Sequence, residues 1–234
     1  MKKTELSLKL ALNGIKQHLE DRYPYTIEVL GEKITICKNV WSPKHSKSTE
    51  FFAKHLGVKR GQTVIEMGCG SGALSIIACK KGASKVLAID ISKDAVKCTK
   101  LNAKKHGLKN KITVSQSDLF QSIPNMQADL IIFNPPFTNA KKKIASPLDL
   151  AVFDPNHRKV DMFLKQAKAY LKPGGKIRIG FSVSVGNPAI LKKIFRKNSY
   201  TSRLVISRKL PHRHHQIYEL KPSDEGQTFN FNSL

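Results

Sequence analysis

The sequence predicts an α/β fold with a parallel, doubly wound sheet. From residue 49 onward, short apolar segments alternate with amphipathic segments of helical period, a pattern typical of strands joined by crossover helices. One apolar segment leads into a glycine-rich turn, and another ends in the residues NPPF at 134–137. Ligands of open α/β sheets bind at the carboxyl ends of the strands, so both segments are candidate parts of a site.

An extension of one helix and one hairpin is expected before the alternating region. The helix is predicted by four apolar residues at helical spacing, Leu8, Leu12, Ile15 and Leu19, which indicate one packed face. Pro24 follows and ends it. The segments TIEVL and KITIC flank Gly31-Glu32, which predicts a hairpin with a type II′ turn. Residues 1–45 are therefore expected to be ordered.

The elements expected after this extension follow in chain order. They are helix 49–56, strand 63–67, helix 73–81, strand 85–90, helix 93–106, strand 111–115, strand 128–133, helix 158–171, strand 175–181, helix 188–197, and strands near 202–207 and 215–220. Phe163, Leu164, Ala167 and Leu171 lie at helical spacing and are expected in the core. The segment Thr138–Pro155 has no clear period, and we expect a mobile loop over the site.

Composition indicates an ordinary globular protein, with 40% apolar and 25% charged residues. No apolar run of roughly 18 residues or more is present, and Glu5 and Lys9 lie where a signal peptide needs an apolar core. A cytoplasmic protein without a membrane segment is therefore expected. The cysteines (Cys37, Cys69, Cys79, Cys98) are too far apart for a CxxC pair and fit free thiols in a reducing compartment.

The chain is strongly basic, with 41 Lys and Arg against 17 Asp and Glu and a formal charge of +24. Residues 176–213 contain ten Lys or Arg and no acid. Such a segment attracts polyanions, so RNA is the expected partner and would bind through 176–213. The alternative is a solvated surface without a partner.

The segment TVIEM-GCGSG-ALSII is a strand, a glycine loop and a helix start. Gly68, Gly70 and Gly72 leave room for backbone to approach a ligand at a helix N-terminus. Because Ala73 completes a G-x-G-x-x-A pattern, NAD is one reading. Glu66 favours another, because an acid at the end of an apolar strand is costly unless it serves a cation. S-adenosylmethionine presents an ammonium and a sulfonium, whereas a pyrophosphate would be repelled.

Two further carboxylates follow the next strands. Asp90 ends KVLAID, where it can accept from both hydroxyls of a ribose; the alternative is a helix N-cap that competes with Ser92. Asp118 follows the third strand and can accept from an adenine amine, although it is also a plausible cap of a short helix. Ile91, with Leu119 or Phe120, would enclose the adenine ring.

The NPPF segment suits a planar nitrogen. The Asn134 side-chain oxygen and the Pro135 carbonyl can both accept from one –NH2 group, and Pro136 stiffens the turn. Phe137 offers a flat face for stacking. The motif therefore predicts binding of an amide or of the exocyclic amine of a base. The alternative is a Pro-Pro turn that only ends a strand.

Other polar residues give no second chemistry. His212 and His214 alternate in PHRHHQ, but no Cys or acid joins them nearby, so a basic hairpin loop is expected and no metal site. Asp154 or Asn156 is most simply a helix cap, although either follows the NPPF loop closely enough to approach a substrate. A Ser-His-Asp arrangement and a phosphate loop are both missing from the sequence.

Together these segments carry a family resemblance. EMGCGSG, AIDIS, SDLF and NPPF, in this order, resemble class I S-adenosylmethionine-dependent methyltransferases over about residues 40–220. NPPF is similar to the motif of the N-methyltransferases that act on planar nitrogens, in two branches: HemK-type release-factor glutamine methyltransferases and RsmC-like "methyltransferase small" enzymes that modify ribosomal RNA. Pro43 and Thr49 are spaced more widely than in the HemK-type pattern.

The resemblance implies a Rossmann-like seven-stranded sheet with the last strand antiparallel. It divides the chain into an extension (1–45), a catalytic domain (46–222) and a tail (223–234). It also implies cofactor roles for Gly68, Gly70, Gly72, Asp90 and Asp118, and substrate roles for Asn134 to Phe137. We expect N-methylation of a base amine in ribosomal RNA. The alternatives are glutamine methylation of a release factor, a non-catalytic RNA-binding module, and an NAD-dependent oxidoreductase.

Overall fold

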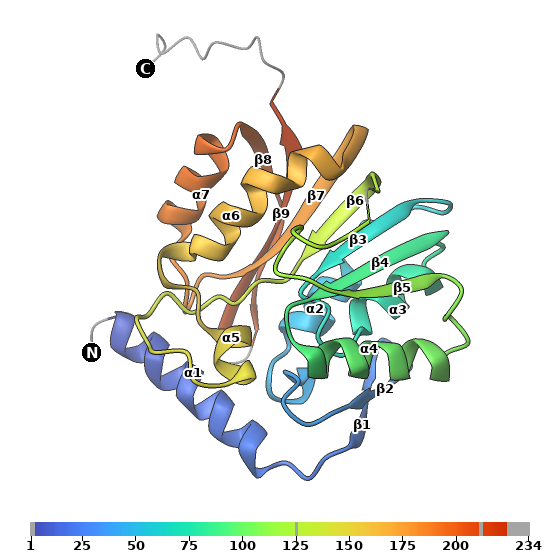
Figure 1. Ribbon diagram of the computed structural model, residues 1–234. Helices are drawn as coiled ribbons and strands as arrows, with labels where there is room; N and C mark the ends of the chain where they lie inside the picture. Colours follow the sequence, from blue (N-terminus) through green and yellow to red (C-terminus); the bar gives the residue numbers. More distant parts are fainter. Residues whose placement is uncertain (1–2, 125, 211–212, 224–234) are drawn as a thin grey trace, which may run out of the picture.

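A seven-stranded sheet in the order β5-β4-β3-β6-β7-β9-β8 forms the centre of the protein (Figure 1). Its strands are β3 (Thr63–Met67), β4 (Lys85–Asp90), β5 (Ile112–Gln116), β6 (Ala128–Phe133), β7 (Leu171–Ser182), β8 (Tyr200–Leu210) and β9 (Arg213–Pro222). Neighbours are parallel from β5 to β7, and β9 is antiparallel to both β7 and β8. This computed structural model describes residues 3–124, 126–210 and 213–223. The predicted sheet, with its antiparallel last strand, is confirmed.

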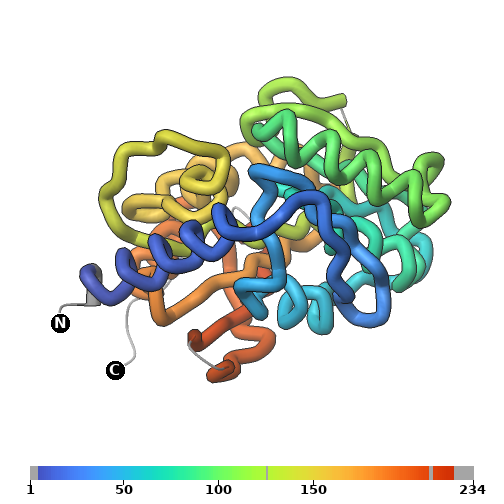
Figure 2. Tube along the Cα trace, turned by 90° about the horizontal axis from the view of Figure 1, so that it is seen from below, coloured from blue at the N-terminus to red at the C-terminus, as the bar shows by residue number. Residues whose placement is uncertain are grey.

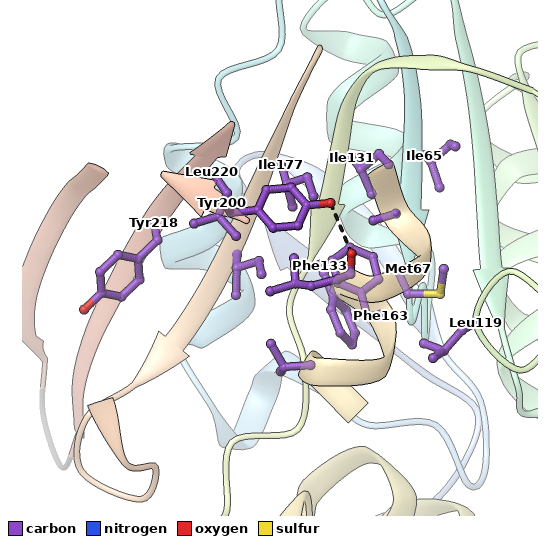
Figure 3. Close-up of a cluster of buried hydrophobic side chains, with 14 of the residues drawn as sticks. Ile65, Met67, Leu119, Ile131, Phe133, Phe163, Ile177, Tyr200, Tyr218 and Leu220 are labelled. Carbon is purple, nitrogen blue, oxygen red and sulfur yellow. Dashed lines mark hydrogen bonds between the residues drawn. The ribbon is translucent and has the colours of Figure 1, made fainter. Parts of the chain in front are cut away.

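The central strands of the sheet, β3, β4 and β6, are apolar on both faces because helices cover them on both sides. One row of cross-strand neighbours runs through Ile65, Ile131, Ile177 and Leu220, all fully buried. Figure 3 shows this row beside Phe133 and Phe163. The Tyr200 hydroxyl donates to the Leu164 carbonyl at 3.2 Å, so the edge of the cluster keeps its polar atom paired.

Helices form a layer on each face. They are α1 (Lys3–Glu20), α2 (Ser48–Lys54), α3 (Ala73–Lys80), α4 (Lys93–Lys105), α5 (Pro147–Val152), α6 (Arg158–Ala167) and α7 (Pro188–Lys197), with 3-10 turns η1 (Pro43–His45), η2 (Pro155–His157) and η3 (Lys168–Tyr170). α6 and α7 pack on one face of the sheet, and α2 and α3 with part of α4 on the other. Phe163, Leu164, Ala167 and Leu171 are buried as predicted.

The first helix buries a different face from the one its leucines predict. Ser7, Ala11, Gly14 and His18 face inward, whereas Leu12 is 42% and Leu19 72% exposed. Small residues allow the helix to approach closely, since a Cβ on Gly14 would lie 3.0 Å from the Trp41 ring. The predicted packed face of this helix was therefore wrong: the buried face is rotated about the helix axis by part of a turn from the face that carries the leucines.

The predicted hairpin is confirmed, but its turn lies one residue earlier. β1 (Tyr25–Val29) and β2 (Glu32–Ile36) pair with Val29 opposite Glu32, so the turn residues are Leu30 and Gly31. Both have positive φ, 51° and 84°, which is the type I′ signature rather than type II′. The hairpin is joined to α4 through Asn102, whose carboxamide binds both the N–H and the carbonyl of Thr35 at 2.9 and 2.7 Å.

The segment Thr138–Pro155 contains structure where a loop without regular elements was predicted. Thr138 and Phe153 form a parallel bridge, and α5 lies between them in sequence. Ser146 caps this helix by accepting from the Asp149 N–H at 3.1 Å. The Asp149 carboxylate in turn accepts from the Ala145 N–H and the Lys142 ammonium. Six residues of helix are too few for a period to be visible in sequence.

In the part of the chain that the structure describes, no helix has the length and apolar character needed to cross a membrane. The same residues contain no group of three or more His, Cys, Asp or Glu arranged for a metal ion. His212 lies outside the described residues, as does the predicted tail beyond Ser223. His214 Nε2 lies 2.7 Å from Ser207 Oγ across the β8–β9 pair.

Candidate active site

A cavity opens at the carboxyl ends of β3, β4 and β6, where the chain order of the strands changes direction. β4 and β5 continue on one side of β3, whereas β6 returns on the other, which is the position where ligands of such sheets bind. The cavity brings together most of the predicted site residues: Glu66, Gly68, Gly70, Asp90, Ile91, Asp118, Leu119, Asn134 and Pro136. Gly72, Pro135 and Phe137 lie outside its lining.

The glycine loop is held in a conformation that side chains would strain. Gly68, Gly70 and Gly72 have φ of 68°, 55° and 79°, a region that favours glycine. A Cβ on Gly70 would meet nothing within 4 Å, so this residue opens onto the cavity, whereas a Cβ on Gly72 would lie 2.8 Å from the Thr99 side chain. Gly70 therefore leaves room for a ligand, and Gly72 leaves room for the packing of α3 against α4.

Asp90 links the glycine loop to the end of β4. Its carboxylate accepts from the Gly70 N–H and the Ser92 N–H, both at 2.9 Å. Burial raises the pKa of the carboxyl, while these N–H groups act in the opposite direction. The cap of α4 is Ser92, whose hydroxyl accepts from the Ala95 N–H. The alternative that Asp90 caps this helix is therefore wrong, and its carboxylate borders the cavity.

Glu66 is a buried acid with no cationic partner among the residues that the structure describes. Its side chain is 2% exposed, and its carboxyl oxygen accepts from the Ser75 hydroxyl of α3. Burial raises the pKa of Glu66 from 4.5 to about 8, because the charged form loses its hydration. The free protein therefore holds this carboxyl largely protonated near neutral pH. A cation placed in the cavity would favour the ionised form.

Glu66→Gln is expected to stabilise the free protein at alkaline pH. The folded-state pKa of about 8 exceeds the usual 4.5, so the wild type loses stability as pH rises through this window, because the unfolded carboxyl ionises first. Glutamine keeps an acceptor for Ser75 and does not ionise. The free energy of unfolding of Glu66→Gln minus that of the wild type should therefore increase by up to ~4 kcal/mol between pH 5 and 9, at about 1.4 kcal/mol per pKa unit.

Urea unfolding of both proteins at several pH values measures this difference. Glu50→Gln is the matched control, because an ion pair with Lys54 lowers the pKa of that carboxyl and confines its contribution to acid pH. A stability difference between Glu66→Gln and the wild type that stays constant from pH 5 to 9 would contradict the burial effect.

The third predicted carboxylate, Asp118, also lines the cavity. Asp118 is exposed, and its carboxylate makes no hydrogen bond within the described residues. The turn that follows is closed by Ser117, whose hydroxyl accepts from the Ser122 N–H at 2.9 Å, so the capping alternative for Asp118 is wrong. Ile91 is 44% exposed and lines the cavity with Leu119. Phe120 instead stacks on Phe163 and Tyr170 in the core.

Asn134 carries the least satisfied polar atom of the site. Its Oδ1 is buried and has no hydrogen-bond partner in the described part of the chain, which is unusual in a folded protein. A Cβ on Gly180 of β7 would lie 2.6 Å from this oxygen, so glycine there makes room for the carboxamide. An unpaired acceptor at the end of β6 is available to an N–H group of a ligand.

Phe137 is placed differently from the expectation. Its ring is 9% exposed and packs edge-on against Phe181 and His215, with centroids 6.4 and 6.2 Å apart. In this arrangement it offers no free face to the cavity. The predicted stacking role of Phe137 stays a prediction.

Trp41 and Lys159 are among the cavity residues that the sequence analysis did not single out. Lys159 donates from its ammonium to the Leu150 carbonyl of α5 at 3.0 Å, and burial lowers its pKa, while Asp154, Asp118 and Asp90 oppose this. Asp154 acts as the predicted cap, because its carboxylate accepts from the Lys159 N–H at 2.9 Å. Neither Trp41 nor Lys159 follows a strand directly, so strand-end reasoning does not find them.

The sheet order, the glycine loop and the three strand-end carboxylates define a class I methyltransferase that uses S-adenosylmethionine. The chain belongs to the Methyltransferase small domain family, whose model matches residues 33–204. A protein of Methanocaldococcus jannaschii that carries the provisional name protein N5-glutamine methyltransferase is 34% identical over 173 residues, which cover 72% of this chain and 85% of that protein.

Two solved structures share the fold. The ribosomal protein L11 methylase of Lactobacillus delbrueckii subsp. bulgaricus superposes with a TM-score of 0.60 at 19% identity, covering 88% of this chain and 93% of that one. A 16S ribosomal RNA N2 methyltransferase of T. thermophilus, solved with S-adenosylmethionine and guanosine, gives 0.63 at 20% identity over 86% and 50%. The enzyme class leaves the non-catalytic and oxidoreductase alternatives unsupported.

The residues of the cavity fit the cofactor of this family. Glu66 is a buried carboxyl with no basic side chain in ion-pair range among the described residues, and a cationic ligand would supply its missing partner. Gly70 leaves open space at the start of α3. The polar groups of the cavity are therefore arranged for a ligand that carries a positive charge near β3 and hydrogen-bond donors near β4.

Proposed function

We propose that this protein transfers a methyl group from S-adenosylmethionine to a planar nitrogen, and that the acceptor is the side-chain amide of a glutamine in a protein substrate. The observation that carries the proposal is the buried, unpaired Oδ1 of Asn134, a residue that lines the cofactor cavity. A donor group brought by a ligand would satisfy this acceptor.

The cofactor supplies the methyl group, and the side chains of the cavity would orient both reactants. Glu66 would face the ammonium of the cofactor, Asp90 its ribose hydroxyls and Asp118 its adenine amine. Ile91 and Leu119 would cover the two faces of the adenine. These roles follow from residue type and position in the cavity, with Gly68 and Gly70 giving the backbone access to the ligand.

The acceptor amine would donate its two hydrogens to Asn134 Oδ1 and the Pro135 carbonyl. An amide nitrogen is a weak nucleophile because its lone pair is delocalised. Two acceptors placed in advance favour a more pyramidal nitrogen and stabilise the positive charge that develops on it. The methylated nitrogen then releases a proton to water without a strong base, so positioning is the main contribution of the protein.

Two observations favour a glutamine amide over a base. The relative from M. jannaschii, similar over most of both chains, is named for glutamine methylation. The basic segment 176–213 is also less available than its sequence indicates, because Glu219 of β9 pairs with three of its cations, Lys176, Arg178 and Arg203.

A ribosomal RNA amine is the second candidate, favoured by the exposed face of α7. Leu191, Ile194 and Phe195 are buried there, whereas four cations, Lys192, Lys193, Arg196 and Lys197, point to solvent as predicted. Only Lys197 pairs with an acid among the described residues, with Asp161 at 3.2 Å. Arg208 and Lys209 add exposed charge on β8.

Transfer of labelled methyl groups would separate the two candidates. The protein is incubated with methyl-labelled S-adenosylmethionine and either a purified release factor or ribosomal RNA. We expect label in the release factor, removed by protease and resistant to RNase. Label that enters only RNA would replace the glutamine proposal with the second candidate, and label in neither would overturn both.

Charge reversal of the α7 face tests the RNA candidate by itself. If several of these cations contact phosphates, log affinity for RNA should fall with log salt at a slope of about −0.7 per contact. The reversal of Lys192, Lys193, Arg196 and Lys197 to Glu should abolish RNA binding and leave cofactor affinity unchanged. The same reversal of four exposed lysines elsewhere, Lys97, Lys100, Lys104 and Lys109, gives the same net charge and is the control. Equal loss of RNA binding in both variants would show that net charge alone, and no α7 site, attracts RNA.

A further inference from the structure

Trp41, the only tryptophan of the chain, lines the cavity that also holds Asn134 and Pro136. It lies in the segment between the hairpin and α2, at the base of the N-terminal extension. The side chain is half-buried. An aromatic residue on a cavity wall gives a planar group a surface to lie on, and this structure leaves that role open because the Phe137 ring is packed away.

The first helix fixes the position of the Trp41 indole. The His18 ring stacks on it with centroids 4.1 Å apart and an interplanar angle of 19°. Gly14 lies beneath its edge, where a Cβ would be 3.0 Å from the indole. One face of the indole therefore packs against α1, and both His18 and Gly14 are buried in this contact.

His18 also has its two ring nitrogens occupied. Nδ1 donates to the Gly14 carbonyl at 2.8 Å, and Nε2 accepts from the Ser42 N–H at 2.7 Å, which requires the neutral imidazole. Burial agrees, since it lowers the pKa of His18 from 6.5 to about 4. One side chain thus joins α1 to both residues of the pair Trp41-Ser42.

The residues that surround Trp41 place it toward the part of the cavity where the methyl acceptor would bind, beside Asn134. The preceding residue, Val40, packs on Ala95 and Cys98 of α4, beside the glycine loop. Trp41 instead packs against the cluster of Ala11, Ala140, Val152 and Phe153, which joins α1 to the α5 region. Figure 2 shows α1 passing along this region. Ala140 and α5 belong to the segment that continues from Asn134, the proposed acceptor site.

We propose that Trp41 supplies the aromatic face against which the planar acceptor group lies, and that His18 and Gly14 of α1 are the positioning residues that hold this face in place. The inference rests on the proposed methyl transfer to a planar nitrogen and adds an acceptor-recognition role for the N-terminal extension. Asn134 would then bind the edge of the acceptor group and Trp41 its face.

Steady-state kinetics of methyl transfer from labelled S-adenosylmethionine to the acceptor substrate test the inference. Trp41→Ala is expected to raise the KM for the acceptor by roughly 2- to 12-fold, as for loss of one aromatic contact, with cofactor Kd within about twofold of the wild type. Trp41→Phe should recover most of the lost affinity, and His18→Gln should raise the same KM with a smaller effect on kcat. Leu19→Ala, on the exposed side of α1, is the control and should change nothing.

Fluorescence gives a readout that does not depend on turnover, since Trp41 is the only tryptophan. With S-adenosylhomocysteine bound, saturating N-acetylglutamine methylamide should protect Trp41 from acrylamide quenching, and less so in His18→Gln. An unchanged acceptor KM in Trp41→Ala, or an equal loss of cofactor affinity, would overturn the inference and leave the proposed methyl transfer intact. If the wild type methylates neither substrate, the proposed function fails, and the quenching result alone then decides the role of Trp41: protection supports it, and unchanged quenching overturns it.

Discussion

Asn134→Ala is expected to lower turnover by on the order of 10²-fold or more, the usual cost of removing one preorganised polar group from an active site, with cofactor affinity nearly intact. The physical reason is the unpaired Oδ1, which makes no bond that the fold itself needs. Its removal therefore leaves the folded protein satisfied but deprives the acceptor nitrogen of one of two proposed hydrogen-bond acceptors. Steady-state kinetics with the substrate that the wild type methylates measure turnover, and calorimetry measures cofactor affinity separately.

Gly180→Ala offers an independent test of the same atom. Its new Cβ would lie 2.6 Å from Asn134 Oδ1, so the carboxamide must move although no group that meets substrate has been removed. Turnover should fall in this variant as well, while the cofactor binds normally.

If Asn134→Ala keeps wild-type turnover on a substrate that the protein methylates, NPPF is only a turn and the proposed mechanism fails.

The sheet was predictable because its strands are buried on both faces. The segment LIIF, residues 130–133, is apolar throughout and is followed by the turn residues NPP, so β6 was placed at its observed bounds. The first helix shows where such reasoning fails. Apolar periodicity selected its leucines, but the close approach of Trp41 to Gly14 favours a face of small residues, and this preference depends on a tertiary contact.

The position of the proposed cofactor residues was predictable for the same reason that the strands were. Glu66, Asp90 and Asp118 each follow or end an apolar strand, and the parallel order of the sheet brings their ends together. Asn134 and Pro136 of the proposed acceptor half were found in the same way, at the end of β6, but Trp41 was not. Trp41 reaches the cavity from an irregular segment whose position depends on His18, a residue 23 positions earlier in the chain.

The number of exposed, unpaired cations in the basic segment was the property that the sequence predicted least well. No acid lies within residues 176–213, yet the antiparallel pairing of β9 with β7 and β8 places Glu219 beside Arg178 and Arg203. Arg178 is nearly buried in this contact, with its guanidinium also donating to the His55 carbonyl at 2.6 Å. A run of cations along the chain therefore becomes a core ion pair plus a smaller exposed group on α7 and β8.

Asp90→Ala is expected to weaken S-adenosylmethionine binding by ~1.5 to 3 kcal/mol, the range for hydrogen bonds to a charged group, which corresponds to roughly 10- to 150-fold in Kd. Two contributions combine in this loss. The proposed bonds to the ribose hydroxyls disappear, and the Gly70 N–H loses the acceptor that fixes the glycine loop at 2.9 Å.

Asp90→Asn separates these contributions, because asparagine keeps one neutral oxygen that can still accept from the Gly70 N–H. If the carboxylate acts through the ribose, this variant should bind the cofactor more weakly than the wild type but more tightly than Asp90→Ala. Asp129→Ala is the control for general destabilisation, since Asp129 pairs with Lys172 at the opposite end of the sheet and should leave cofactor Kd unchanged. Calorimetry that finds wild-type affinity in Asp90→Ala would refute the ribose assignment, and tight NAD binding by the wild type would refute the choice of cofactor. A loss in Asp90→Ala that Asp90→Asn fully restores would instead assign the effect to the glycine loop, because only the contact with Gly70 is common to the wild type and the asparagine variant.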